Sequence, residues 1–342
     1  MAERLSIGID IGGTRVKAGV VDLDGHVLAR LSRDTPTTSP MAVLDAIADI
    51  VATLRRHHYV TSVGIGAAGF VDATQSTVLF SPHLAWRHEP LRDAVQRRTG
   101  LSVLVDNDAN AAGWAEWRFG AAQNEEYMVC LTLGTGIGGA LVIDGRPHRG
   151  RYGIAGEFGH MIVVPDGRAC ECGNHGCLEQ YASGNALIRD AREAMDRGDD
   201  YGKRLLERLD GDPDQVSGLV VSELARDGDE DALRCLEDVG AWLGIGIANL
   251  AAAFDPALFV IGGGVSDADE LLLEPARESF RRTLTGRGFR PEALIVRAHL
   301  GNDAGMIGAA DMARSVRRRA RRGRRRRPRA EGSLVRLSGR RG

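Results

Sequence analysis

The sequence predicts an α/β protein built from two related lobes that face each other. Its 342 residues exceed what one average hydrophobic core holds, so two packed units are expected. A segment at residues 9–21, IDIGGTRVKAGVV, aligns without gaps on a second at 131–143, LTLGTGIGGALVI. Segments typical of strands and of amphipathic helices alternate between these copies. A structural half that is used twice explains both observations.

Each copy of the repeat reads as a strand, a tight glycine-rich turn and a second strand. Residues 134–139, GTGIGG, satisfy the dinucleotide pattern G-x-G-x-x-G, but the strand GALVIDG follows where that pattern requires a helix. Neither turn has the Lys-Ser or Lys-Thr ending of a P-loop. Glycines can simply permit a tight turn. Two matched turns with hydroxyls at Thr14 and Thr135 instead favour a pair of phosphate cradles.

Between the repeats, the elements follow in a regular order. Residues 39–58 predict a helix that Ser39 and Pro40 begin, with an apolar face that includes Val43, Ile47 and Leu54. Residues 60–72 predict a strand that enters a glycine loop, and 89–100 predict a helix that a glycine ends. Residues 101–120 predict a strand that leads directly into an alanine-rich helix.

Asp106, Asn107 and Asp108 stand where that strand gives way to its helix. Asn and Asp are preferred helix caps, and one of the three is expected to cap. Ligands bind at strand carboxyl ends in α/β sheets, so an acid here could also accept a proton from a hydroxyl group. These residues alone leave both interpretations open.

Three of the five cysteines, Cys170, Cys172 and Cys177, fall in the polar segment CECGNHGC. Buried apolar thiols fit poorly among such neighbours, and a Cys170–Cys172 disulfide would be strained. A zinc site of three thiolates and one histidine fits the cluster better. His160 and His175 are both candidates for the fourth ligand. Four protein ligands would close the site, so a structural role is expected rather than a catalytic one.

Composition indicates an ordinary soluble protein, with 43% hydrophobic and 26% charged residues. The apolar stretch AWLGIGIANLAAAF is too short for a membrane span and suits a buried helix. The start MAERLSIGID does not resemble a signal peptide, so a cytoplasmic location and no membrane association are expected. From Arg314 onward, 14 arginines oppose one acid, Glu331, in a chain whose net charge is −2. We expect this tail to be a disordered, solvated segment, with contact to polyanions as the alternative.

Several motifs occur in an order and spacing that resemble the ROK family of bacterial sugar kinases, especially its ATP-dependent glucokinases from high-GC Gram-positive bacteria. They are DIGGTRVKAG, VDNDANAAGWAE, LTLGTGIGGALVIDG, GEFGHMIVVPDG, CECGNHGCLEQYASG and FVIGGGVS. The resemblance spans about residues 5–314. It implies the actin-like ATPase fold, a ribonuclease H-like fold with two lobes around a central cleft. A small lobe would contain residues 1–118 and a helix at 303–316 that returns to it. A larger lobe would contain residues 119–302 with the zinc loop. Residues 317–342 would form the disordered tail.

The resemblance also implies transfer of the γ-phosphate of ATP to the 6-hydroxyl of glucose, with Asp108 as general base. It places sugar contacts at Asn107, Asp108, Glu157, His160 and Glu179. ATP and Mg²⁺ would be bound through Asp10, Gly12, Gly13, Thr14, Thr135, Gly136, Gly262, Gly263 and Gly264. The family pattern selects His160, with Cys170, Cys172 and Cys177, as the ligands of structural Zn²⁺.

Several other functions, within this class and beyond it, are alternatives to that expectation. The acceptor could be another hexose or an acylated amino sugar, and polyphosphate could replace ATP as donor. A sugar-sensing transcriptional regulator would need a DNA-binding domain, and only nine residues precede Asp10. Relatives in the family are commonly dimers or tetramers, so a homo-oligomer is expected.

Overall fold

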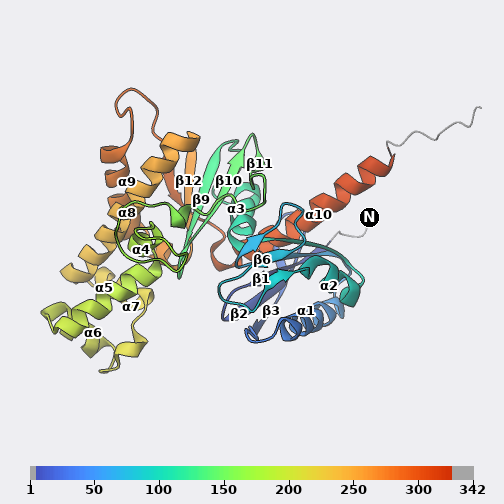
Figure 1. Ribbon diagram of the computed structural model, residues 1–342, viewed down its shortest axis with the longest axis horizontal. Helices are drawn as coiled ribbons and strands as arrows, with labels where there is room; N and C mark the ends of the chain where they lie inside the picture. Colours follow the sequence, from blue (N-terminus) through green and yellow to red (C-terminus); the bar gives the residue numbers. More distant parts are fainter. Residues whose placement is uncertain (1–4, 326–342) are drawn as a thin grey trace, which may run out of the picture.

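Two five-stranded sheets with the same strand order form the framework of the protein (Figure 1). The computed structural model describes the backbone of residues 5–325 and side chains through residue 314. The first sheet has the order β3-β2-β1-β4-β8, and the second has the order β11-β10-β9-β12-β13. Within each sheet, the first three strands along the chain pair antiparallel, and the last two strands add in parallel. The strands are β1 (Leu5–Ile11), β2 (Arg15–Val21), β3 (Val27–Asp34), β4 (Val60–Ala67), β8 (Ser102–Asn107), β9 (Met128–Leu133), β10 (Ile137–Ile143), β11 (Arg146–Pro147), β12 (Leu258–Gly262) and β13 (Leu294–Arg297).

The two hairpins are equivalent in topology, but their turns differ in length. The last pair of the first hairpin joins Ile11 to Val16, and residues 12–15 form its turn. The last pair of the second joins Leu133 to Ile137, which leaves only residues 134–136. The predicted duplication of the hairpin is confirmed. The ungapped alignment of the two copies is wrong beyond the turn, because the second turn is one residue shorter.

Two helices cover the outer face of the first sheet, as their sequences predict. In α1 (Pro40–Arg55), the Ser39 side chain accepts a hydrogen bond from the Ala42 amide, and the predicted apolar stripe is buried. Gly100, in the left-handed conformation with φ of 70°, ends α2 (Leu91–Thr99). A small third sheet lies beside them and contains β5 (Phe70–Val71), β6 (Val78–Phe80) and β7 (Arg87–Glu89).

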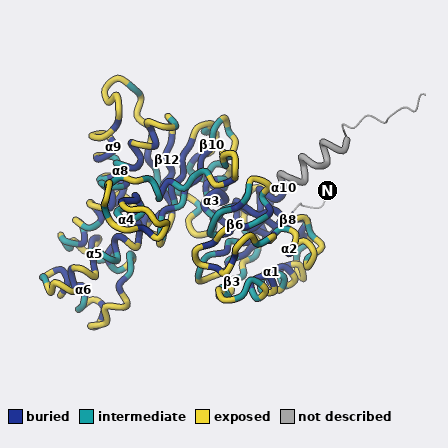
Figure 2. Tube along the Cα trace, viewed as in Figure 1, coloured by how far each residue is buried: buried dark blue, intermediate teal, exposed yellow. Residues whose placement is uncertain are grey.

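The helices of the second half gather around one side of the second sheet (Figures 1 and 2). In the described chain, α8 (Glu230–Phe254) is the one helix long and apolar enough to cross a bilayer. Its buried residues, among them Leu243 and Ile247, instead belong to the core under this sheet. The other helices here are η1 (Phe158–His160), α4 (Glu179–Ala182), α5 (Gly184–Arg197), α6 (Asp200–Arg208), η2 (Pro213–Gln215), α7 (Gly218–Arg226), η3 (Gly264–Ala268) and α9 (Glu270–Thr283).

Helices α3 (Asp108–Phe119) and α10 (Ala304–Arg325) pack against each other beside the first sheet. The 3₁₀ turn η4 (Gly301–Asp303) directly precedes α10. The backbone of α10 touches the sheet directly. A Cβ added at Gly8 would lie 1.8 Å from the Met306 carbonyl oxygen, and one at Gly64 would lie 1.8 Å from that of Ala309. Only glycine permits such close approach.

Helix α10 continues beyond the predicted end at residue 316. The prediction of disorder from residue 317 is therefore not met for 317–325, which are helical. Alanine and arginine are strong helix formers, so the end of α10 can extend through this composition. Residues 326–342 of the predicted tail lie outside the described residues, and the division into lobes at 118/119 stays a prediction.

Candidate active site

The junction of β8 and α3 gives its three polar residues different roles. Asn107 is the cap, because its side-chain oxygen accepts a hydrogen bond of 3.0 Å from the Asn110 amide. Asp106 is buried and accepts hydrogen bonds from Gln75 and Arg149, each at 2.7 Å. Asp108 begins the helix, and its carboxylate accepts only from the adjacent Ala109 amide among the hydrogen bonds of the described side chains. The carboxylate of Asp108 is therefore the one left available to a ligand.

Asp108 and Asp10 share one electrostatic environment at the carboxyl ends of their strands. Burial raises the pKa of Asp108, while the Ala109 amide and the nearby His83 lower it in part. Burial, followed by the charge of Asp108, raises the pKa of Asp10 to about 7, against a lowering effect of Lys17. A carboxylate whose pKa is raised by burial and by a neighbouring carboxylate can be stabilised as an anion by a bound cation.

Glu157, His160 and Glu179 come together with Asp108 on the side of the second sheet. Burial raises the pKa of Glu157 first, His160 lowers it, and the charges of Asp108 and Glu179 raise it further. Glu179, the first residue of α4, accepts a hydrogen bond of 2.8 Å from the Ile137 amide at the start of β10. The structure thus brings together all of the side chains that the sequence analysis expects to contact a sugar.

A pocket of about 20 Å³ lies beside Glu157 and Asn107. Asn107 and Asn110 line it from α3 and its cap, and Glu157 lines it from the second half of the chain. The wall also contains residues 69–71, 138–139 and 153–155. The pocket therefore draws on both halves of the duplicated fold.

The second glycine turn lies against both Glu179 and the loop that follows β12. A Cβ at Gly136 would lie 2.1 Å from a carboxylate oxygen of Glu179. A Cβ at Gly263, where φ is 84°, would lie 2.4 Å from the Leu133 carbonyl oxygen. The Gly184 amide at the start of α5 donates to the Gly134 carbonyl at 2.8 Å. Thr135 and Gly136 are thus adjacent to Gly262–Gly264, as expected for one ligand that spans them.

The first glycine turn carries an exposed Thr14 beside the partly buried Gly12 and Gly13. The Gly12 amide donates to the Arg15 carbonyl at 3.1 Å, and the Thr35 hydroxyl donates to the Gly12 carbonyl at 2.9 Å. Asp10 lies at the end of the strand that leads into this turn.

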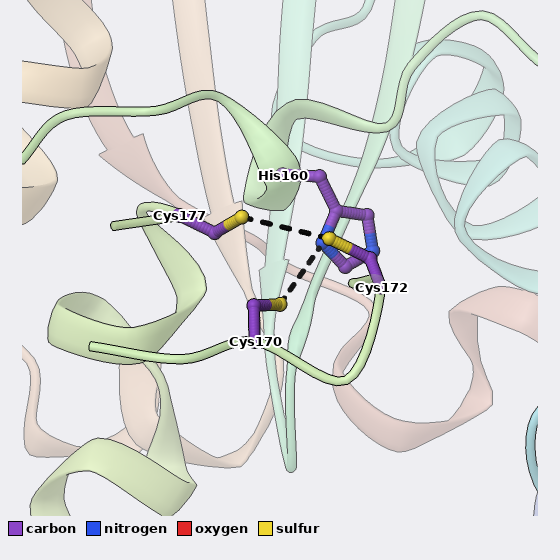
Figure 3. Close-up of side chains that lie close together, drawn as sticks. All are labelled: His160, Cys170, Cys172 and Cys177. Atoms are coloured by element: carbon purple, nitrogen blue, oxygen red, sulfur yellow. Dashed lines mark hydrogen bonds between the residues drawn. The ribbon is translucent and has the colours of Figure 1, made fainter. Parts of the chain in front are cut away.

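The three clustered cysteines and His160 converge on one point (Figure 3). Their ligand atoms all lie within 4.8 Å of one another. The His160 Nδ1 atom is 3.6 Å from the Cys170 sulfur, and the sulfurs of Cys172 and Cys177 are 3.7 Å apart. His175, the alternative ligand, is exposed and does not belong to the cluster.

This cluster has the dimensions of a tetrahedral zinc site. Two sulfurs bound to one Zn²⁺ at about 2.3 Å each would be separated by about 3.8 Å. Burial, together with the neighbouring thiols, raises the pKa of Cys177 to about 12. A divalent cation would offset this cost by stabilising the thiolates. A Cys/His site that can hold a metal is therefore present.

The cluster joins the two segments that carry Glu157 and Glu179. His160 ends the 3₁₀ turn that begins after Glu157, and Cys177 precedes Glu179 by two residues. Between them, Ile162 pairs with Cys177 and the Leu178 amide donates to the Met161 carbonyl at 2.8 Å. A metal here would fix the separation of the two carboxylates.

Three residues near the site carry no signal in the sequence. Lys17 lies near Asp10, His83 lies near Asp108, and Arg149 pairs with Asp106. Lys17 stands only seven residues after Asp10, but its strand position does not mark it as part of a site. His83 and Arg149 lie in polar loops and reach the site through tertiary contacts alone.

The sequence profile of the ROK family matches residues 6–316. A glucokinase from Streptomyces coelicolor is 48% identical over 310 residues, which is 91% of this chain and 98% of that protein. A glucokinase from Thermotoga maritima is 37% identical and covers 90% of this chain and 96% of its own length. The crystal structure of a ROK family glucokinase from Streptomyces griseus, in complex with glucose and AMPPNP, matches with a TM-score of 0.85. It is 50% identical and covers 91% of this chain and 99% of that one.

These similarities and the two matched sheets define the actin-like ATPase fold, and the predicted fold class is confirmed. Within that class, the chain belongs to the ROK family.

Proposed function

We propose that this protein is an ATP-dependent glucokinase that transfers the γ-phosphate of ATP to the 6-hydroxyl of glucose. The observation that carries the proposal is the position of Asp108, a partly buried carboxylate with a raised pKa. It lies close enough to Glu157 to raise the pKa of that residue, and Glu157 in turn lies near His160 and Glu179. The identity with glucokinases over nearly the whole chain supports the same conclusion. A carboxylate whose pKa is raised toward neutrality is suited to accept the proton of an attacking alcohol.

The sugar would be held by hydrogen bonds from several sides. Asn107, Glu157, His160 and Glu179 would orient its hydroxyls, and Asp108 would accept the proton of the 6-hydroxyl. Because phosphoryl transfer demands mainly position and charge neutralisation, alignment of the alcohol is the principal contribution of these residues. Closure of the two lobes would exclude water as a competing acceptor.

The nucleotide would lie across the two glycine turns. Gly12, Gly13 and Thr14 would bind phosphate oxygens from the first sheet, and Thr135 and Gly136 from the second. Gly262–Gly264 would lie near the adenosine, because their loop contacts the second turn. Asp10 would hold Mg²⁺ through water, and the cation would neutralise charge on the β- and γ-phosphates.

The Cys/His cluster would hold a structural Zn²⁺ through His160, Cys170, Cys172 and Cys177. With four protein ligands, the ion would have no open position for catalysis. Its contribution would be to position Glu157 and Glu179 in one pocket.

The remaining expectations belong to the same proposal. Residues 1–118 with helix 303–316 would form the small lobe and 119–302 the larger one. The protein would be a cytoplasmic homo-oligomer, a dimer or tetramer. The arginine-rich end would be a solvated segment without an essential role, with contact to polyanions as the alternative.

A coupled ADP-release assay over a panel of sugars tests the proposed reaction, with Asp108→Asn as the inactive control. We expect glucose to give the highest kcat/KM and Asp108→Asn to lower kcat by about 10³-fold or more. Equal turnover of this variant and the wild type would contradict the role of Asp108. A higher kcat/KM on another hexose or an acylated amino sugar would reassign the substrate.

The phosphate donor is tested in the same assay by exchanging ATP for polyphosphate. We expect ATP to be the donor, and deletion of residues 317–342 to leave its kcat/KM unchanged. A polyphosphate activity that depends on these residues would instead favour the alternative donor, since a polyanion binds arginines electrostatically.

A further inference from the structure

His83 lies between the first glycine turn and Asp108. A Cβ placed on Gly13 would lie 3.0 Å from the Cβ of His83 and 3.3 Å from its Cγ. The imidazole is also close enough to Asp108 for its charge to affect that carboxylate. His83 therefore faces one proposed phosphate-binding turn and the proposed base at the same time.

The loop that carries His83 is firmly held, although His83 itself is exposed. It joins β6 to β7, and the Ser81 amide donates to the Trp86 carbonyl at 3.4 Å. The Arg87 guanidinium donates to the carbonyls of Ser81 at 2.9 Å and Leu84 at 3.2 Å. Leu84 and Trp86 are buried on either side of this loop. The position of His83 is therefore set by packing of its neighbours.

The reaction requires the phosphorus atom to pass between these two features. In an in-line transfer, the attacking and leaving oxygens stand on opposite sides of the phosphorus, and charge spreads over its three equatorial oxygens. Asp108 would mark the attacking side, and the glycine turn would mark the phosphates of the donor. A side chain that faces both Asp108 and the first glycine turn, as His83 does, would lie beside the equatorial oxygens.

We propose that His83 is a further catalytic residue, whose ring N–H donates a hydrogen bond to an equatorial oxygen of the phosphoryl group as it is transferred. This inference rests on the proposed function. It does not depend on the charge of the ring, because a neutral imidazole still carries one N–H. The hydrogen bond strengthens as charge develops on the equatorial oxygens, so it acts on kcat more than on ground-state binding.

Two substitutions in the full chain separate the N–H from the shape of the side chain. His83→Phe keeps a planar ring and removes the donor, whereas His83→Gln retains an amide N–H. His57→Phe makes the same exchange at an exposed histidine in the loop between α1 and β4. Wild type and Asp108→Asn are assayed beside them with glucose and MgATP.

We expect His83→Phe to lower kcat by about 10- to 100-fold, with the KM values for glucose and MgATP little changed. His83→Gln should recover most of the loss, and His57→Phe should match the wild type. His83→Phe should also weaken the binding of aluminium fluoride in the presence of MgADP and glucose, without weakening MgADP alone.

An unchanged kcat in His83→Phe, beside an inactive Asp108→Asn, would overturn the inference and leave the proposed function intact. Equal losses in His83→Phe and His83→Gln, or a raised KM for glucose with normal kcat, would also overturn it. A wild-type protein that does not phosphorylate glucose would overturn both proposals.

Discussion

Arg149 and Asp106 form a buried ion pair that joins the loop after β11 to the end of β8. The Arg149 Nη2 atom is 2.5 Å from the Asp106 carboxylate, and the Asp106 side chain is 1% exposed. The loop that contains Arg149 follows β11 of the second sheet and reaches β5 of the small third sheet. A Cβ at Gly153 would lie 2.5 Å from the Val71 carbonyl oxygen. Because Asp106 directly precedes Asn107 and Asp108, this pair connects the second sheet to the proposed base.

Arg149→Ala should destabilise the protein by about 3 kcal/mol, because it leaves the charge of Asp106 buried without its ionic partner. Denaturant unfolding measures the loss. Arg151→Ala is the matched control, since Arg151 is exposed in the same loop. Equal stabilities of the two variants would show that Asp106 does not depend on Arg149.

Cys172→Ser should bind less than one equivalent of zinc, and both thermal stability and glucose affinity should fall. The reason is that the cluster holds the segments of Glu157 and Glu179 together. Metal analysis by mass spectrometry, with the KM for glucose, tests this expectation; we expect the KM to rise about tenfold.

The histidines provide the control for the metal site. His160→Gln should lose zinc as Cys172→Ser does, whereas His175→Gln should retain it, because only His160 lies within the cluster. A variant that loses zinc but keeps normal kinetics would contradict the positioning role.

Asp10→Asn should make the protein more stable at pH 8 while it abolishes activity with MgATP. Burial and the charge of Asp108 raise the pKa of Asp10 to about 7, above its ordinary value of 3.8. Between these values the folded state binds more protons than the unfolded state, so stability falls as pH rises through this range. Asn lacks this loss, which a shift of this size puts at about 4 kcal/mol.

Thermal unfolding of both proteins from pH 4 to pH 8, without divalent cations, measures the effect of Asp10. The stability difference should vanish at pH 4 and be complete at pH 8. Asp24→Asn, at an exposed position, should leave the pH dependence of the wild type unchanged. Parallel curves for Asp10→Asn and wild type would contradict a raised pKa.

Gly136→Ala should weaken glucose binding, because the new methyl group would occupy the position of the Glu179 carboxylate. The free energy of unfolding should also fall by about 1–3 kcal/mol. Gly134→Ala is the control for stability, since a Cβ there has nothing within 4 Å. In the double variant Gly136→Ala/Glu179→Asp, the shorter acid should restore part of the stability that Gly136→Ala loses. A double variant no more stable than Gly136→Ala would argue against contact between the new methyl group and Glu179.

Local patterns in the sequence predict the elements and the duplicated hairpin, because strand alternation, helix caps and glycine turns act over a few residues. The α1 stripe and its Ser39 cap illustrate this agreement. The turn lengths do not follow from the same signals. Both turns contain glycine and threonine, and the pairing of Leu133 with Ile137 shows that the second turn is shorter.

The role of each residue in the Asp106–Asp108 run depends on partners that are distant in sequence. Asp and Asn are both good caps, so local preference does not choose among the three residues. Asp106 is directed inward by Arg149 and Gln75, and Asn107 takes the cap. Only these tertiary contacts leave Asp108 available. His83 is missed for the same reason, since its significance arises from its proximity to Gly13 and Asp108.

The contact of α10 with Gly8 and Gly64 has a mechanical consequence. At these two glycines the backbone of the helix lies directly on the strands, so the helix cannot slide without backbone collision and moves with the first sheet as one rigid piece. The chain passes from this piece to the second sheet in two places, residues 120–127 and 298–303. Any rotation of one half against the other must therefore be absorbed in those two short connections.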